Sequence, residues 1–285
     1  MNELNERIVT AVMRSDAAEV CDCLAPGTCV NATNHSGWTA LHFACSCAAP
    51  DIVRLLIERG IEVHAQDSCG MTALHVAALS GRPEIIRLLL EAGSAADSRD
   101  QYGVTPLFLA AACGNVDTVR PILQAGACID LADDLGYTAA HWAASNRDSG
   151  ITSLLLHAGT PLHATESEGM TALHVAATAR NTEVARLLLQ AGIAVDQQDK
   201  RGQTALHLSV RSRDVPTAAL LLDAGASIHI PNVEGDTALV LAQAQGDAGM
   251  RQLLSDAKEQ STQLVYIERS SSFLRRWKKQ GLMAS

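Results

Sequence analysis

A Gly-x-Thr tripeptide recurs along this chain at a constant spacing of 33 residues. The glycines are Gly37, Gly70, Gly103, Gly136, Gly169, Gly202 and Gly235, and the threonines are Thr39, Thr72, Thr105, Thr138, Thr171, Thr204 and Thr237. Matched motifs at a fixed period of this size indicate a stack of small units with the same structure, rather than one globular core. Stacked units present long surfaces to other macromolecules, so binding is the first function to consider.

The second copy of the motif shows what each unit should contain. Gly70 suits a turn that needs positive φ, and Thr72 stands where it can cap a helix. Gly81 can end that helix in the left-handed conformation, and Pro83 is tolerated in the first turn of the next one. The two helices are expected over about residues 72–80 and 83–91.

The segments GMTALHVAA at 70–78 and LLLEAG at 88–93 carry a family resemblance. They resemble the Gly-x-Thr-x-Leu-His-x-Ala-Ala pattern and the Leu-Leu-Leu-x-x-Gly close of the ankyrin repeat. The resemblance implies an all-α solenoid of stacked helix-turn-helix units. It also implies loops that project as β-hairpin fingers, and a concave groove, lined by fingers and first helices, where protein partners sit.

The repeat phase divides the chain into three parts. In residues 1–33, Gly27 occupies the repeat position of the glycine that closes the second helix, but the Gly-x-Thr motif is missing. We therefore expect an N-terminal capping unit there. Seven ankyrin repeats are expected in 34–260, and residues 261–285 form a basic C-terminal tail. The repeats run over 34–66, 67–99, 100–132, 133–165, 166–198, 199–231 and 232–260.

Departures from the repeat pattern predict local irregularity. Pro121 falls inside a second helix, where the missing N–H should kink or shorten it. Ala140 replaces the usual leucine of the first helix, and Trp142 is expected to fill the space. Arginine takes the place of the turn glycine between helices in three repeats, at a cost of about 1 kcal/mol each if φ stays positive. These arginines are Arg147, Arg180 and Arg213.

Histidines at one repeat position invite a catalytic interpretation, which their repetition argues against. A catalytic histidine needs one set of partners, not five copies. In ankyrin repeats the histidine at this position bonds to backbone and braces the fingers, so the resemblance implies a structural role. The five are His42, His75, His141, His174 and His207.

Eight cysteines lie in the first half of the chain, and we expect free thiols that fill small apolar spaces. Cys21-x-Cys23 and Cys45-x-Cys47 do not have the spacing of zinc ligands. Cys45 follows His42 by three residues, but no orienting group or oxyanion donor accompanies the pair. The sequence therefore predicts a protein that is not an enzyme, with no catalytic residue, no metal site and no cofactor.

Charge is distributed unevenly along the chain. Residues 1–260 hold 17 basic and 30 acidic side chains, a balance of −13, whereas 261–285 have a balance of +4. An acidic body argues against nucleic acid, because phosphate neutralisation supplies most of such binding. The sequence lacks a secretory signal and a long apolar run. We expect a monomeric protein of a reducing compartment, cytoplasmic or alternatively nuclear, with membrane contact only through the tail.

A candidate binding surface follows from the resemblance, which places the residue between Gly and Thr at the base of each finger. Read along the stack, this position is apolar in five repeats and polar in the last two, Gln203 and Asp236. Such residues serve a partner interface or simply pack finger on finger, and both alternatives stand. The candidate partner-binding residues are Trp38, Met71, Leu79, Tyr102, Val104, Leu135, Tyr137, Met170 and Arg211.

The tail suggests a second function. Its apolar residues fall on one face of a helix that basic residues surround, an arrangement used at membranes and by calmodulin-like partners. Nuclear import, docking on the chain's own acidic array and disorder are the alternatives. The candidate targeting residues are Phe273, Leu274, Arg275, Arg276, Trp277, Lys278 and Lys279.

The leading hypothesis is an adaptor, scaffold or inhibitor that binds a protein partner along the concave groove. The first alternative is a targeting module that uses the basic tail. The second is a substrate of an asparaginyl or histidinyl hydroxylase, because the resemblance places suitable residues at the modified finger position. Those residues are Asn31, His64, Asp97, Asp130, His163, Asp196 and His229.

Overall fold

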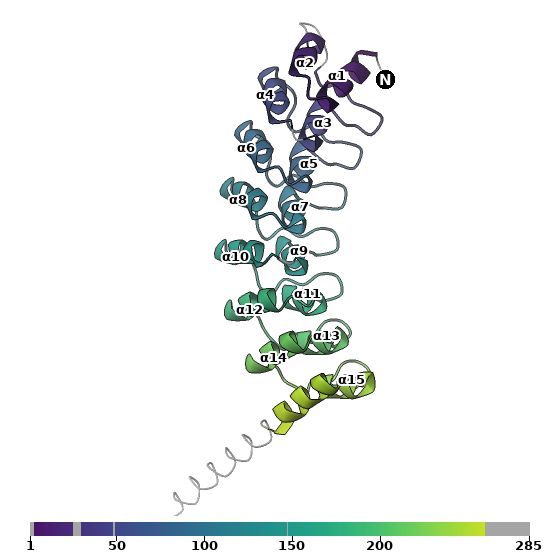
Figure 1. Ribbon diagram of the computed structural model, residues 1–285, viewed down its shortest axis with the longest axis vertical. Coiled ribbons are helices and arrows are strands. Elements are labelled where there is room, and N and C mark those ends of the chain that lie inside the picture. Colours follow the sequence, from purple (N-terminus) through teal and green to yellow (C-terminus); the bar gives the residue numbers. More distant parts are fainter. Residues whose placement is uncertain (1–2, 25–29, 48, 147, 260–285) are drawn as a thin grey trace, which may run out of the picture. The chain divides into compact units, whose positions relative to one another are not determined.

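The computed structural model describes residues 3–24, 30–47, 49–146 and 148–259. Short helices are joined in pairs, and each pair is followed by a protruding loop (Figure 1). The chain divides into two compact units, which are treated separately below. The N-terminal unit is Met1–Ser167 with Gln190–Gly192, and the C-terminal unit is Glu168–Leu189 with Ile193–Ser285.

The N-terminal unit stacks its helices in two layers. From α3 onward, the odd-numbered helices pack on one another in order, and so do the even-numbered helices from α2 onward. The first helix, α1, packs on α2 and α3 at the end of the stack. The bounds are α1 Glu3–Met13, α2 Ala17–Cys23, α3 Ala40–Ser46, α4 Pro50–Glu58, α5 Ala73–Leu79, α6 Pro83–Glu91, α7 Pro106–Cys113, α8 Val116–Gln124, α9 Ala139–Ser145 and α10 Ser149–His157.

The C-terminal unit continues the same pattern, with α11 packed on α13 and α13 on α15. Its helices are α11 Ala172–Thr178, α12 Thr182–Gln190, α13 Ala205–Arg211, α14 Val215–Asp223, α15 Ala238–Gln245 and a last helix over 248–259. The predicted helix pairs and their recurrence every 33 residues are therefore confirmed. In the described part of the chain, no helix has the length and apolarity needed to cross a bilayer.

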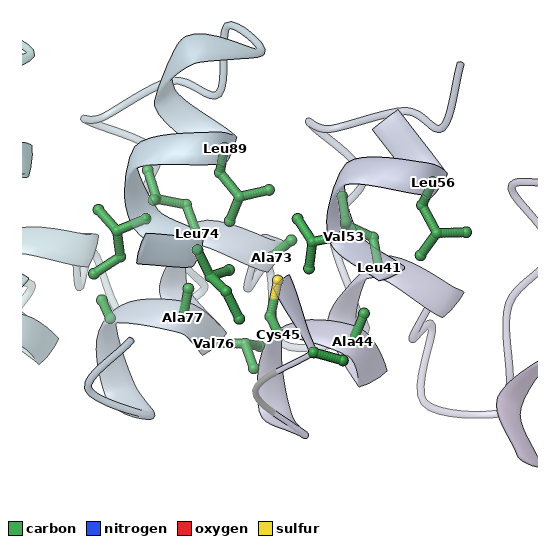
Figure 2. Close-up of a cluster of buried hydrophobic side chains, with 14 of the residues drawn as sticks. Leu41, Ala44, Cys45, Val53, Leu56, Ala73, Leu74, Val76, Ala77 and Leu89 are labelled. Atoms are coloured by element: carbon green, nitrogen blue, oxygen red, sulfur yellow. The ribbon is translucent and has the colours of Figure 1, made fainter. Parts of the chain in front are cut away.

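The core consists of small and aliphatic side chains between the layers. Figure 2 shows part of it, where Cys45 of one repeat lies beside Val76 of the next. Small residues on the inner helices let neighbouring helices approach closely, while Leu56 and Leu89 fill the space under the outer ones. A core of this kind explains how the chain folds with only 3% aromatic residues.

The fingers are tight loops held by hydrogen bonds. In the second repeat, Asp67 Oδ1 accepts the backbone N–H groups of Cys69 and Met71, at 2.8 and 2.9 Å. The N–H of Gln101 then donates to the carbonyl of Cys69 in the previous finger, at 2.8 Å. Among the described residues, β-type backbone pairing within a finger is limited to one isolated antiparallel bridge, between Gln66 and Thr72. Successive finger tips are thus joined directly through their backbones.

Two expectations do not hold: the shortening of a helix at Pro121 and the place of Trp142. Helix α8 contains Pro121 yet spans nine residues, the same length as α6, so the proline does not shorten it. Proline removes one hydrogen bond, whereas packing against α6 and α10 holds the rest of the helix. Trp142 does not fill the space beside Ala140, because residues two apart point about 200° from each other on a helix. Trp142 instead lies 38% exposed.

The arginines that replace turn glycines keep the glycine conformation. Arg180 and Arg213 have φ of 57° and 55°, close to the 65° of Gly81, so the condition for the strain cost is met at these two positions. Arg147 lies outside the described residues. A side chain in the left-handed region is strained because Cβ approaches the following carbonyl oxygen.

Replacing this strained arginine should stabilise the protein. We expect Arg180→Gly to raise the free energy of unfolding by about 0.5–1 kcal/mol, because glycine removes the Cβ strain. Arg186→Gly, at an exposed position of helix α12, should lower it by about 1 kcal/mol. Urea unfolding followed by circular dichroism measures both. The same sign for the two variants would contradict the strain argument.

Candidate partner-binding surface

The repeated histidines join one repeat to the next. His75 is fully buried, and its Nδ1 accepts the backbone N–H of Thr72 at 3.0 Å and faces the Thr72 hydroxyl at 2.9 Å. Its Nε2 donates to the carbonyl of Val104 in the next finger, at 3.1 Å. Because Nδ1 receives an N–H and Nε2 faces a carbonyl, the ring is the neutral Nε2–H tautomer. His75 therefore caps its own helix and braces the following finger.

Three equivalent histidines make the same link. His42 bonds to Met71, His174 to Gln203 and His207 to Asp236, at 3.0–3.2 Å. Burial lowers the pKa of His42, His75 and His207 below the ordinary 6.5, opposed by their bonds to carbonyls and by nearby aspartates. These rings are structural, and both nitrogens of each are already engaged.

Burial disfavours the thiolate form of two cysteines, Cys45 and Cys113. Burial raises the pKa of the Cys45 thiol, which disfavours the nucleophilic thiolate. The Cys113 thiol donates to the carbonyl of Leu79 at 2.9 Å, and burial raises its pKa as well. All seven described cysteines are free. Within the described ranges, no three His, Cys, Asp or Glu side chains are grouped so that they could hold a metal ion.

The C-terminal unit contains a hollow of about 420 Å³ between two fingers and the inner helices α11 and α13. Its walls come from a few recurring repeat positions. Except for Asp199, which lies three residues before the glycine, they are the residues on either side of the Gly-x-Thr glycine and those four, seven and eight residues after its threonine. The lining residues are Glu168, Met170, Thr178, Asp199, Arg201, Gln203, Leu208, Arg211 and Ser212.

We call these five positions, taken together, the finger–helix face of each unit. Because the units repeat, the same positions of the N-terminal unit line an equivalent surface. Ring contacts confirm two neighbours there: Trp38 meets Phe43 at 5.0 Å, and Tyr137 meets Trp142 at 5.9 Å. The finger–helix face is thus built jointly by finger bases and first helices.

The finger–helix face differs in charge between the repeats over 34–165 and the repeats from 166 onward. In the four repeats over 34–165, none of the residues at the five positions is charged. In the repeats from 166 onward, the same positions carry Glu168, Arg201, Arg211, Glu234 and Asp236. Apart from the finger aspartates Asp67, Asp100 and Asp133, whose Oδ1 atoms accept backbone N–H groups of their own fingers, the face of the N-terminal unit is therefore uncharged, on an acidic body.

Several predicted binding residues lie on this uncharged face. Leu79, Tyr102 and Leu135 are 53, 63 and 60% exposed, although they are apolar or aromatic. The finger-base residues Trp38, Met71, Val104 and Tyr137 are half-buried. The other two predicted residues, Met170 and Arg211, belong to the C-terminal unit and line its hollow.

Trp38 has a structural partner that reduces its value as a binding residue. Its indole N–H donates to Asp67 Oδ2 of the next finger at 2.9 Å. Finger packing thus accounts for Trp38. Sequence reasoning missed Phe43 and Trp142 as members of the face, and a large side chain four residues after the motif threonine was the signal that could have found them.

Two other groups of predicted residues are not part of this face. The tail residues Phe273, Leu274, Arg275, Arg276, Trp277, Lys278 and Lys279 lie outside the described residues. At the finger position suited to hydroxylation, three side-chain oxygens accept backbone N–H groups of the next repeat, at 2.8–2.9 Å. The pairs are Asn31 with Glu62, Asp97 with Cys128, and Asp196 with Ser227.

Stacked helix pairs with joined fingers define a repeat protein of the solenoid class. The family profile described as ankyrin repeats, in three copies, matches residues 2–67, 62–133, 92–166, 123–199 and 140–232. The chain therefore belongs to the ankyrin repeat family. Domains of this family are generally protein–protein interaction modules and are typically non-catalytic.

Solved structures agree with this assignment. The human ASB11 ankyrin repeat domain is 28% identical with a TM-score of 0.72, over 77% of this chain and 98% of that one. The ankyrin repeat domain of Bcl-3, described as a unique member of the IkappaB family, is 26% identical with a TM-score of 0.67. That match covers 78% of this chain and all of the other. A search of curated proteins found no match.

Proposed function

We propose that this protein binds a protein partner through the finger–helix face of its N-terminal unit. The observation that carries the proposal is the absence of charge at the five face positions over 34–165, in a chain region rich in carboxylates. Interface cores are depleted in charged residues and enriched in aromatic residues and methionine. Tyr102, Tyr137 and Trp142 supply the aromatic content, and Met71 lies among them along the face.

Finger packing alone does not account for this surface. Packing explains half-buried residues such as Met71 and Val104, but it leaves Tyr102 and Leu135 without a reason for being apolar. Both lie at finger tips and are about three-fifths exposed. Grouped apolar side chains that face solvent mark interaction sites.

The role we propose is that of an adaptor, scaffold or inhibitor, which holds a partner without chemical change. The partner should present apolar, largely uncharged side chains to this face, because a charge would lose its hydration there without gaining a counter-ion. We place the protein in the cytoplasm or nucleus, where exposed thiols such as Cys69 and Cys113 stay reduced.

Removing the two exposed finger-tip side chains should weaken binding. We expect Tyr102→Ala with Leu135→Ala to raise the Kd of a partner on the order of tenfold or more, since buried aromatic anchors dominate interface energies. Partners are recovered with the intact chain as bait and identified by mass spectrometry. Their affinity is then measured by titration calorimetry with purified proteins.

A matched control uses two exposed apolar residues that lie off the face. Met13→Ala with Val233→Ala removes side chains that are 61 and 72% exposed, and it should leave the Kd unchanged. Circular dichroism should be the same for both double variants. Equal affinity of the face variant and the control variant would rule out this surface as the binding site.

A further inference from the structure

The hollow of the C-terminal unit carries two arginines without ionic partners. Arg201 lies at a finger tip and Arg211 at the end of α13, and both line the same 420 Å³ space. Within the described residues, the ion pairs are Arg7–Glu19, Arg99–Asp134 and Arg186–Glu183, so neither of these arginines belongs to one. Each guanidinium therefore offers its N–H donors to solvent or to a ligand.

The hollow also contains two carboxylates, and Asp199 is bonded to the backbone of its own finger. Asp199 Oδ1 accepts the backbone N–H groups of Arg201 and Gln203, at 2.9 and 2.7 Å, and thereby shapes the finger. Glu168 belongs to the preceding finger and is exposed. Arg201 and Arg211 are also the basic residues of the finger–helix face across the described repeats, and both converge on this hollow.

Apolar side chains complete the wall. Met170 at one finger base and Leu208 on α13 line the hollow, beside the small polar residues Thr178 and Ser212. A ligand that fits must therefore offer a negative group to the guanidiniums and an apolar group to the methionine and leucine. Methionine adapts to apolar groups of different shape, and guanidinium binds carboxylate through two parallel N–H bonds.

We propose that this hollow binds an acidic peptide segment of a partner protein, with its carboxylates on Arg201 and Arg211. An adjacent leucine-like side chain of the segment rests on Met170 and Leu208. The site is separate in chemistry from the uncharged face of the N-terminal unit, and its existence does not depend on that proposal. It would make the C-terminal unit selective for acidic sequence.

The test titrates the full chain with two peptides blocked at both ends. One contains Leu-Glu-Glu-Leu and the other Leu-Gln-Gln-Leu, so that they differ only in charge. Binding is followed by NMR through the Arg side-chain Nε–H signals, up to millimolar peptide. We expect the glutamate peptide to bind about tenfold more tightly, with shifts at Arg201 and Arg211, and the preference to fall as salt is raised.

Variants inside and outside the hollow test whether the peptide preference comes from Arg201 and Arg211. Arg201→Gln with Arg211→Gln should abolish the difference between the peptides, whereas Arg180→Gln, an exposed arginine outside the hollow, should preserve it. The Tyr102→Ala, Leu135→Ala variant should also preserve it, so failure of the N-terminal face would be seen separately. Equal binding of the two peptides, no binding of either, or a preference that survives loss of both arginines would overturn the proposal.

Discussion

Lowering the pH from 7.5 to 5.5 is expected to destabilise the folded protein well before its carboxylates titrate. The cause lies in the neutral, buried rings of His42, His75 and His207, whose pKa values burial lowers. The unfolded chain takes up protons near pH 6.5, while the folded protein resists protonation. The contribution of these rings is therefore complete above about pH 6.5 and is lost as the pH falls toward their lower folded-state pKa values.

The expected change in the free energy of unfolding with pH is large, because several buried rings contribute to it. Each ring contributes up to about 1.4 kcal/mol per pH unit below 6.5, for as long as the folded protein keeps it neutral. Urea unfolding at several pH values measures the slope. His75→Gln removes one of these rings and should reduce the slope. Stability that stays constant over this pH range would contradict the argument.

Adding one methyl group to Gly70 is expected to cost about 3 kcal/mol of unfolding free energy. Gly70 has φ of 81°, and a Cβ there would lie 2.9 Å from the backbone nitrogen of Gln101 in the next finger. That nitrogen donates to Cys69 at 2.8 Å, so relief of the clash must stretch or break the bond between the two fingers. Conformational strain and a lost hydrogen bond therefore act together.

Gly93 provides the matched control for this prediction. Its φ is 89°, but a Cβ added there meets nothing within 4 Å. We expect Gly93→Ala to cost only about 1 kcal/mol, which is the conformational strain alone. Thermal and urea unfolding of both variants measure the difference. Equal losses would show that finger contact adds nothing to the requirement for glycine at position 70.

Local signals in the sequence were sufficient for the elements of this fold. Thr72 and Pro83 mark helix starts, Gly81 marks a helix end, and their recurrence gives the order of the stack. These residues act within one or two turns of backbone, so their consequences are visible without the rest of the molecule. The structural role of the repeated histidines also followed, through the family resemblance.

Features that depend on neighbouring repeats were harder to predict. Pro121 favours a shortened helix, but contacts from α6 and α10 maintain its full length. Trp142 was expected in the core and lies on the finger–helix face, because the direction of a side chain depends on its position around the helix. The indole bond of Trp38 to Asp67 joins residues of two successive fingers.

The sequence by itself determined the repeat, its phase and the finger-base position between Gly and Thr, because a spacing of 33 residues places equivalent side chains in equivalent surroundings. Only the tertiary structure decided which of those side chains remain exposed, as Tyr102 and Leu135 do. It also decided that Arg201 and Arg211 line one hollow without a carboxylate partner. Exposure and pairing depend on atoms brought together by stacking, and distances between repeats are not encoded in the residues of any single repeat.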